Sequence, residues 1–466
     1  ESGQKFKNYH NADGTAKSLS NNNIFDIFED RQNTVWIATY FGGLNYVLPQ
    51  NSRLEHISTS SPIGQRLFSN STIGLLDFDD AYWIGTEDAG INILDKKTKK
   101  ISQLETYNAN YNIRDLFTRN GKVYVPEFGT GYSTIDLTTL HTQQHPMDSV
   151  IMSNKNVVFG MIVDRKGDLY LGTRAGPFNI KNDQKAMPIT ELGVSVWVDF
   201  KENSKGDIYA KHHGGSLFIK KFNTNKFEKI TLKSIEDFFI DAQDRIWLSS
   251  ENAIYKLDAK NQLIKVKEFT GLKPLRLAYF NDKLWITSIE GLIIYDPQND
   301  YTNSLTKEDG LPQTNLMEAR IKLSTDNKIF LLTPQGLIFF DPLTLTFNKS
   351  TPEVSLNDIL LNNNRSILSR LQKLNDHSYK IELAHNENAL TLTFGSNNLL
   401  KPNKNKYKYR LTGTDEPWIE TTQPIIRYTN LPRGEHVFQI FTSNNDGTWS
   451  KEPMEINGCE LTNLCV

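Results

Sequence analysis

One sequence motif recurs along most of the chain. In its fullest form, residues 24–46, it runs through an alternating apolar segment, Asp30, a turn, the segment Val35–Thr39, a glycine pair and a last short apolar segment. Eight copies align, and each carries a large aromatic residue in its second strand: Trp36, Trp83, Tyr124, Tyr170, Tyr209, Trp247, Trp285 and Phe330. A period of roughly 40–45 residues with about four strands predicts the blades of a β-propeller.

The number of blades depends on how the ring closes. The first strand of each copy is strongly apolar, as expected where neighbouring sheets cover both faces, and the fourth is polar, as expected at an outer edge. An outer strand at residues 6–9 would complete eight blades, whereas one at residues 54–57 would complete seven. The sequence permits either ring.

A second domain follows the repeats. The repeated motif ends near Asn348. Residues 351–466 contain short segments of alternating apolar and polar residues at spacings of 8–12 residues, separated by Gly, Pro and Asn. This pattern predicts a β-sandwich of the immunoglobulin or fibronectin-III kind. The expected fold is therefore all-β, with a propeller of seven or eight four-stranded blades over residues 1–350 and a sandwich over 351–466.

Composition narrows the classes of function. A formal net charge of −2 gives no electrostatic reason to expect nucleic acid or an anionic membrane surface as a partner, since both call for clustered Lys/Arg. No run of about 18 apolar residues is present, so no segment is expected to span a bilayer. The start at Glu1 is not an initiator or a signal peptide, which indicates a processed or excised segment. Cys459 and Cys465 could form a small disulfide, but a pair in the tail is more simply idle.

These features resemble a known family. The repeats resemble the regulator-propeller repeats in the periplasmic sensor regions of Bacteroidetes hybrid two-component systems. The resemblance is carried by residues 18–22, which lead into the first copy, and by residues 36–46, 83–86 and 309–312. The second domain resembles the three-tyrosine (Y_Y_Y) domain that follows such propellers, on the following residues: Tyr407, Tyr409, Trp418, Tyr428, Pro432, Gly434 and the segment 445–449. His436 stands where the third tyrosine would be, which is a departure from that pattern.

The resemblance implies an architecture and a function. Such sensors usually have two propellers, the sandwich, a membrane helix and a histidine kinase, so residues 1–50 are a candidate closing blade of a preceding propeller, and the membrane helix and kinase lie outside this chain. It implies a periplasmic region that binds an oligosaccharide and signals as a homodimer. We expect the sandwich to act as coupler and dimer contact, with no ligand of its own, because a ligand on a rigid propeller can act at a distance only by shifting the arrangement of the whole molecule.

Catalytic chemistry is not evident. No nucleophile–base arrangement, phosphate-binding glycine loop or metal-spaced Cys/His cluster stands out, and the doublet His212-His213 has no third ligand in view, so we expect no catalytic residue, metal or other cofactor. The recurrent Asp30, Asp79, Asp164 and Asp241 occupy one turn position in each copy, which indicates turn formation. A propeller lyase or hydrolase acting on polysaccharide, and a protein-binding scaffold, are the alternative functions.

The expected ligand site lies in the loops after each second strand and in those entering each first strand. In a propeller these loops converge on one face, and aromatic groups mixed with hydrogen-bonding groups suit carbohydrate. Arg174 could pair with a carboxylate or sulfate on an acidic sugar. The candidate ligand-binding residues are Tyr40, Phe41, Glu127, Phe128, Arg174, Trp197, His212 and His213. If the ligand instead binds in a pocket shared with a missing propeller, several of these predictions would fail together.

Overall fold

The computed structural model of the chain describes most of its length. The described residues are 10–11, 18–30, 34–47, 54–146, 157–181, 185–258, 260–313, 315–361, 365–384, 387–412, 417–431 and 434–461. They divide into two compact units, one of residues 52–345 and one that combines residues 1–51 with 346–466. The predicted strand at residues 6–9 and the tail residue Cys465 lie outside the described residues.

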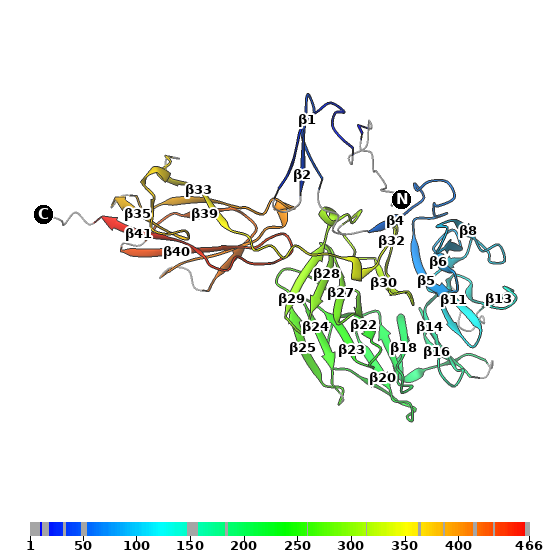
Figure 1. Ribbon diagram of the computed structural model, residues 1–466. Coiled ribbons are helices and arrows are strands. Elements are labelled where there is room, and N and C mark those ends of the chain that lie inside the picture. Colours follow the sequence, from blue (N-terminus) through cyan, green and yellow to red (C-terminus); the bar gives the residue numbers. More distant parts are fainter. Residues whose placement is uncertain are drawn as a thin grey trace. The chain divides into compact units, whose positions relative to one another are not determined.

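Residues 52–345 form a ring of antiparallel sheets, each ordered from its innermost to its outermost strand (Figure 1). The first blade contains β5 (Thr72–Phe78), β6 (Ala81–Thr86), β7 (Ile91–Asp95) and β8 (Ile101–Gln103). The second contains β9 (Asn112–Ile113), β10 (Phe117–Arg119), β11 (Lys122–Phe128), β12 (Gly131–Asp136) and β13 (Thr142–His145). The third contains β14 (Val158–Val163), β15 (Leu169–Thr173), β16 (Gly176–Ile180) and β17 (Met187–Pro188).

The remaining blades follow the same order. The fourth contains β18 (Trp197–Glu202), β19 (Ile208–His212), β20 (Leu217–Lys220) and β21 (Phe227–Lys229). The fifth contains β22 (Ile235–Ile240), β23 (Ile246–Ser250), β24 (Ala253–Leu257) and β25 (Leu263–Glu268). The sixth contains β26 (Leu277–Phe280), β27 (Lys283–Ser288), β28 (Gly291–Asp296) and β29 (Tyr301–Leu305). The seventh contains β30 (Arg320–Leu323), β31 (Ile329–Thr333) and β32 (Gly336–Phe340).

The ring closes through a strand from the start of the unit. β4 (Glu55–Ile57) pairs antiparallel with β32, with Glu55 opposite Phe339 and Ile57 opposite Leu337. It thereby becomes the outermost strand of the last blade, so the described ring has seven blades. Of the two closures that the sequence permits, the structure has the one at residues 54–57.

The repeated residues have repeated roles. Asp241 accepts hydrogen bonds from the backbone N–H of Gln243 and Arg245 and from the indole N–H of Trp247, so one carboxylate forms the turn and orients the aromatic residue that follows. The indole of Trp247 stacks on Tyr279 of the next blade, with ring centroids 5.2 Å apart. The core is therefore a series of apolar clusters between neighbouring blades, as the recurring aromatic predicts.

Two glycines let one blade approach another. A Cβ added at Gly160 would lie 2.6 Å from the Val198 carbonyl oxygen. A Cβ added at Gly172 would lie 2.5 Å from the Trp197 carbonyl oxygen. The third blade is thus closely packed against the start of β18, and this contact fixes the position of Trp197.

A separate three-stranded sheet precedes the ring. It consists of β1 (Ile24–Glu29), β2 (Val35–Thr39) and β3 (Gly43–Val47), in that order. Every residue of β1 is exposed, including Phe25 at 73% and Phe28 at 63%, although this strand has the sequence of a buried inner strand. Apolar side chains exposed on this scale are unusual for a free surface and typical of a contact surface.

Residues 346–466 form a sandwich of two sheets, as predicted. One sheet has the order β33 (Val354–Leu361), β36 (Leu390–Ser396), β39 (Ile425–Tyr428). The other has the order β34 (Gln372–Lys373), β35 (Ser378–Ala384), β41 (Met454–Leu461), β40 (Glu435–Thr442), β37 (Tyr407–Leu411), β38 (Ile419–Thr421). Tyr407 is 6% exposed in the core between them, and Tyr409 stacks on Phe438. These two tyrosines are packing groups.

Helical structure is slight. The described residues contain 3-10 turns at Thr190–Leu192, Lys307–Asp309, Pro342–Thr344, Leu368–Arg370 and Pro402–Lys404. Among the described residues, none of the helices has the length and apolar character that crossing a membrane requires.

Candidate ligand-binding face of the propeller

Strand pairing places most of the predicted site residues on one face of the ring. The start of an innermost strand lies opposite the end of the second strand in the following pairs: Thr72 with Thr86, Asn112 with Phe128, Val158 with Thr173, Trp197 with His212, and Ile235 with Ser250. Because every blade has the same orientation in a propeller, these ends share a face. Glu127, Phe128, Arg174, Trp197, His212 and His213 lie at or beside such ends.

Glu127 is buried rather than presented to solvent. Its carboxylate accepts hydrogen bonds from the hydroxyls of Tyr107 at 2.7 Å and Ser133 at 2.5 Å, and also from Thr130. Burial and the adjacent carboxylate raise the pKa of Tyr107, so its hydroxyl remains a donor. Glu127 therefore holds the loop after β8 against the second blade, and it contacts a ligand only if that loop moves.

Phe128 belongs to a partly exposed cluster that we call the blade-two patch, made of Glu87, Arg114 and Phe128, in which the Arg114 side chain is 19% exposed. The Arg114 guanidinium lies 4.9 Å from the centroid of the Phe128 ring and donates a hydrogen bond of 2.9 Å to the Glu87 carboxylate. Phe128 is 37% exposed. An aromatic face beside a guanidinium can stack on the CH face of a sugar while pairing with an acidic substituent.

Trp197 and His212 form a second group, on the fourth blade. The His212 ring lies edge-on to the buried Trp197, with centroids 5.3 Å apart, and its Nε2 is 2.6 Å from the Ser195 hydroxyl. Burial, with help from the charges of His213 and Lys211, lowers the pKa of His212, so the ring is neutral near pH 7. The adjacent His213 is exposed. This group can exchange hydrogen bonds with a neutral hydroxyl.

The other predicted residues are exposed but dispersed. Arg174 lies in the turn between β15 and β16, on the blade between the two groups just described. Tyr40 and Phe41 lie in the turn between β2 and β3 of the separate sheet, 63% and 85% exposed, with their ring centroids 5.3 Å apart. The structure therefore places six of the eight candidates on one face of the ring, and Tyr40 and Phe41 in the other compact unit.

The sequence did not indicate a set of charges that the innermost strands, together with neighbouring loops and the second strand β19, bring close to one another, which we call the axial cluster. Lys322 of the seventh blade forms an ion pair of 2.9 Å with Asp115 of the second, and Arg320 donates a hydrogen bond of 2.6 Å to the Arg114 carbonyl oxygen. Arg276 pairs with Asp237 at 3.5 Å. The cluster contains Glu87, Arg114, Asp115, Asp199, Lys201, Lys211, Glu236, Asp237, Lys273, Arg276, Arg320 and Lys322.

The axial cluster has a surplus of positive charge. Seven of its side chains are cationic and five are carboxylates. Burial lowers the pKa of Lys211 despite the nearby Asp237, and it lowers the pKa of Arg320 despite the nearby Asp115. The local carboxylates therefore do not fully compensate Lys211 and Arg320, whereas at Lys201 the carboxylates of Asp199 and Asp237 outweigh burial and raise the pKa. An anionic group entering from the face would be attracted.

Some polar atoms at the same face have no hydrogen-bond partner among the described residues. They are buried, and include Arg114 Nε, Asn112 Oδ1 and Trp197 Nε1. Buried polar atoms usually have a partner in the protein or in solvent, so two donors and one acceptor left over at this face are suited to a ligand or to water. Within the same described residues, no three His, Cys, Asp or Glu side chains gather as metal ligands would.

Comparison with known proteins gives the context for this face. The model of the Y_Y_Y domain matches residues 398–457, and the model of the two component regulator propeller matches residues 18–41, which contain β1 and β2. The chain is 23% identical over 494 aligned positions to histidine kinase P4 of Formosa agariphila, covering 98% of this chain and 32% of that protein. It thus spans about a third of this relative.

Solved structures show the same fold. The extracellular domain of the hybrid two component system BT3049 from B. thetaiotaomicron superposes with a TM-score of 0.72 at 18% identity, over 97% of this chain and 64% of that one. The extracellular domain of BT4673 from the same organism gives 0.54 at 18% identity, over 100% and 66%. The chain resembles the sensor region of a two-component system. The resemblance found in the sequence is therefore confirmed.

On this face of the propeller, sequence reasoning found some site residues and missed others. The repeat predicts where the loops lie, so Phe128, Arg174 and His213 could be predicted from the sequence. The axial cluster could not be predicted in this way, since it joins residues as far apart in sequence as Asp115 and Lys322, which are separated by 207 positions. The one available signal was the presence of charged residues in inner strands that are otherwise apolar, such as Lys201 and Arg320.

Proposed function

We propose that this chain is the extracytoplasmic, periplasmic sensing region of a hybrid two-component regulator. On this proposal it binds an oligosaccharide that carries an acidic group, on the propeller face described above, and transmits the signal through a homodimer. The membrane helix and kinase that this function requires belong to parts of the protein outside this chain. The order of the two matched families, with the propeller repeat before the Y_Y_Y domain, is the observation that carries the sensor assignment.

The chemistry of the face supports the ligand class. The blade-two patch offers a half-exposed aromatic ring beside a guanidinium, and the axial cluster, which shares Glu87 and Arg114 with the patch, has more cations than carboxylates. Arg174 adds an exposed cation on the neighbouring blade. Neutral hydroxyls can bond to the Ser195–His212 pair. Aromatic stacking, hydroxyl partners and a positive field are together what an acidic sugar chain requires.

Binding without turnover is part of the proposal. Glu127 is buried among three hydroxyls, and the carboxylates Glu87, Asp115 and Asp237 are engaged with cations. A pair of carboxylates set for glycoside hydrolysis needs one protonated and one ionised member on opposite sides of the scissile bond. Carboxylates already occupied by cations are poorly placed to donate a proton to a leaving group.

The test is calorimetric titration of the chain with acidic oligosaccharides, uronic acid-containing or sulfated, and with neutral oligosaccharides of equal length. Product formation is followed in the same samples by chromatography. We expect saturable binding of an acidic ligand without product, and weakening by at least tenfold in Arg114→Met. Arg119→Met is the matched control, because Arg119 lies at the far end of β10 with a longer ion pair of 3.6 Å to Glu202.

Contrary results would separate the parts of the proposal. Turnover of a glycan would replace the sensor with the lyase or hydrolase. Equal affinity for neutral and acidic ligands, unaffected by Arg114→Met, would remove the acidic group from the ligand class while leaving a sugar sensor in place.

A further inference from the structure

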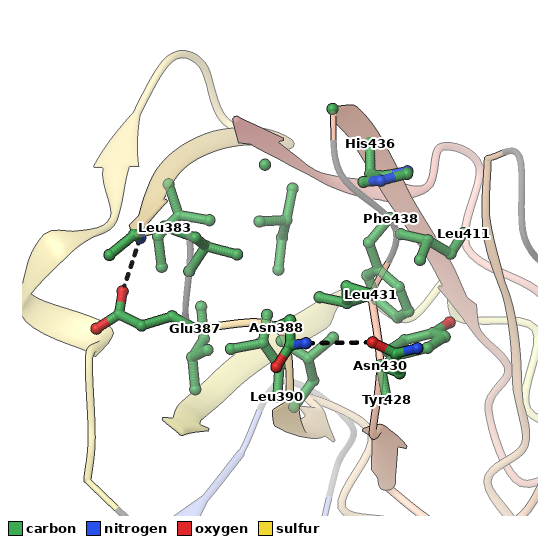
Figure 2. Close-up of a pocket in the computed structure, with 17 residues that line it drawn as sticks. Leu383, Glu387, Asn388, Leu390, Leu411, Tyr428, Asn430, Leu431, His436 and Phe438 are labelled. Atoms are coloured by element: carbon green, nitrogen blue, oxygen red, sulfur yellow. Dashed lines mark hydrogen bonds between the residues drawn. The ribbon is translucent and has the colours of Figure 1, made fainter. Parts of the chain in front are cut away.

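A cavity opens into the core of the sandwich. It has a volume of about 300 Å³ and lies between the two sheets (Figure 2). Its wall is made mainly of apolar side chains from both sheets, among them Ile381, Leu383, Leu392, Leu411, Phe438 and Ile456. Several of these are core residues with little exposure, such as Ile381 at 3% and Ile456 at 4%. The cavity therefore reaches the centre of the domain and is not a surface dent.

The size of the cavity is unusual for a domain interior. Protein cores pack like organic crystals, with few voids larger than a water molecule. An apolar cavity of about 150 Å³ stays dry and takes up benzene. The cavity in the sandwich is about twice as large, which suits a substituted single ring or a short aliphatic chain.

The rim of the cavity is polar and its charge is compensated. The amide of Asn388 donates a hydrogen bond of 3.1 Å to Asn430 Oδ1, and the His436 imidazole lies on the opposite strand (Figure 2). The Glu387 carboxylate accepts two hydrogen bonds from Arg370, at 2.7 and 3.1 Å, and a third from the Ala384 N–H. Those hydrogen bonds, with Arg370 foremost, hold the pKa of Glu387 below its usual value.

We propose that this cavity binds a small amphipathic molecule, with a single ring or a short aliphatic chain inside and an uncharged hydrogen-bonding head at the amides of Asn388 and Asn430. An uncharged head follows from the rim, because Arg370 is already engaged by Glu387 and offers no free counter-charge to an anion. The site is independent of the sugar site on the propeller, and it replaces the expectation that the sandwich has no ligand of its own.

The location gives such a ligand a route to the rest of the domain. Ile456 and Gly458 of the wall belong to β41, the last strand, which pairs parallel with β35 and antiparallel with β40. Ile381 and Leu383 on β35 and Phe438 on β40 also line the cavity. An occupant therefore packs against three adjacent strands of one sheet and stabilises their pairing.

The test uses the whole chain labelled at its Ile and Leu methyl groups and observed by NMR. Benzyl alcohol is the neutral probe, and benzoate, of similar size, is the charged control. We expect saturable shifts confined to cavity methyls such as those of Ile381, Leu392 and Ile456, and binding of benzoate at least tenfold weaker. Equal shifts of propeller methyls, or no saturable shift with benzyl alcohol, would overturn the proposal.

A cavity-filling variant provides the second measurement. A Cβ added at Gly458 has the His436 carbonyl oxygen, at 3.8 Å, as its nearest neighbour, so Gly458→Leu adds volume with room for its first atom. We expect it to reduce benzyl alcohol affinity at least tenfold and to raise the melting temperature. Glu382→Leu adds the same side chain on the outward face of β35 and should keep the affinity.

Unchanged probe binding in Gly458→Leu would place the probe elsewhere and reject the cavity as its site. Should that variant fail to fold, the titration of the parent chain decides alone, because the pattern of shifted methyls identifies the site directly.

Discussion

The Tyr82 hydroxyl, on the second strand of the first blade, donates a hydrogen bond of 2.5 Å to the Asp326 carboxylate, which lies in a turn of the last blade. Lys328 binds both, at 2.8 Å to Asp326 and 3.0 Å to the Tyr82 oxygen. Burial and the carboxylate raise the pKa of Tyr82 to about 12. This triad joins the two ends of the ring, 244 residues apart in sequence.

The first prediction concerns the pH dependence of that closure. Burial alone would raise the pKa of Asp326, but hydrogen bonds from Lys328, Ser324 and Tyr82 lower it from 3.8 to about 2. A carboxyl whose pKa is lowered by folding stabilises the folded state at pH values above its ordinary pKa. This stabilisation is lost as the pH falls from about 4 to about 2. Because the side chain is a third exposed, we expect about 1 kcal/mol rather than the full equivalent of the shift.

Denaturant unfolding of the parent chain and of Asp326→Asn measures this contribution. The difference in free energy of unfolding should be about 1 kcal/mol at pH 7 and should shrink as the pH approaches 2. Asp88→Asn, an exposed carboxylate on the first blade, is the control and should show no such trend. A difference for Asp326→Asn that stays constant across this range would contradict the assignment.

The second prediction concerns β4. Removal of residues 1–50 should leave the melting temperature of the propeller unchanged, because β4 remains available to close the ring. Removal of residues 1–58 should lower it strongly, because β32 then has an unpaired edge and the buried Ile57 is lost. Ile57→Ala should cost about 2–3 kcal/mol. Ile63→Ala, at a side chain 88% exposed, is the control. Equal stability of the two truncations would reject a seven-bladed closure.

The third prediction separates a structural from a binding role for Glu127. Glu127→Gln keeps the size but leaves three hydroxyls competing for a weaker acceptor, so we expect a loss of about 2 kcal/mol in stability. Tyr107→Phe removes one of those hydrogen bonds and should cost about 1 kcal/mol. Both are measured by thermal melting alongside ligand titration. A stable Glu127→Gln protein that has lost only ligand affinity would show that Glu127 contacts the ligand directly.

The fourth prediction concerns self-association. If the Y_Y_Y domain is the dimer contact, deleting residues 351–466 should leave the affinity of the propeller for its sugar ligand nearly intact and weaken dimerisation. Light scattering over a range of concentrations measures the dimerisation of the two proteins. The same degree of association with and without the domain would exclude this role.

Most of the fold follows from local patterns in the sequence. The six-residue spacing between Asp241 and Trp247 is also found between Asp30 and Trp36. In both places one carboxylate accepts a hydrogen bond from the indole N–H, so the repeated spacing predicts the blade. The ring closure does not follow, because β4 and β32 lie some 280 residues apart and a three-residue strand such as Glu55–Ile57 has little pattern of its own. Only the pairing of Ile57 with Leu337 decides it.

The candidate site was less accessible to sequence reasoning. Glu127 looks like an exposed loop residue, but Tyr107, Thr130 and Ser133 enclose it, and these come from three different positions in the chain. The axial cluster depends on contacts such as Arg320 with Arg114, which no period in the sequence encodes. The cavity in the sandwich is a property of packing between sheets, and alternating apolar residues are the same whether a core is full or hollow.

The pairing of β4 with β32 has a mechanical consequence. The two strands are antiparallel, so the end where the chain enters at Glu55 lies beside the end where it leaves after Phe339. Tension applied between the segments before and after the ring would load this pair at one end and peel it apart one hydrogen bond at a time, leaving the other blades unloaded. The strand that closes the propeller is thus also the first that a pulling force would open.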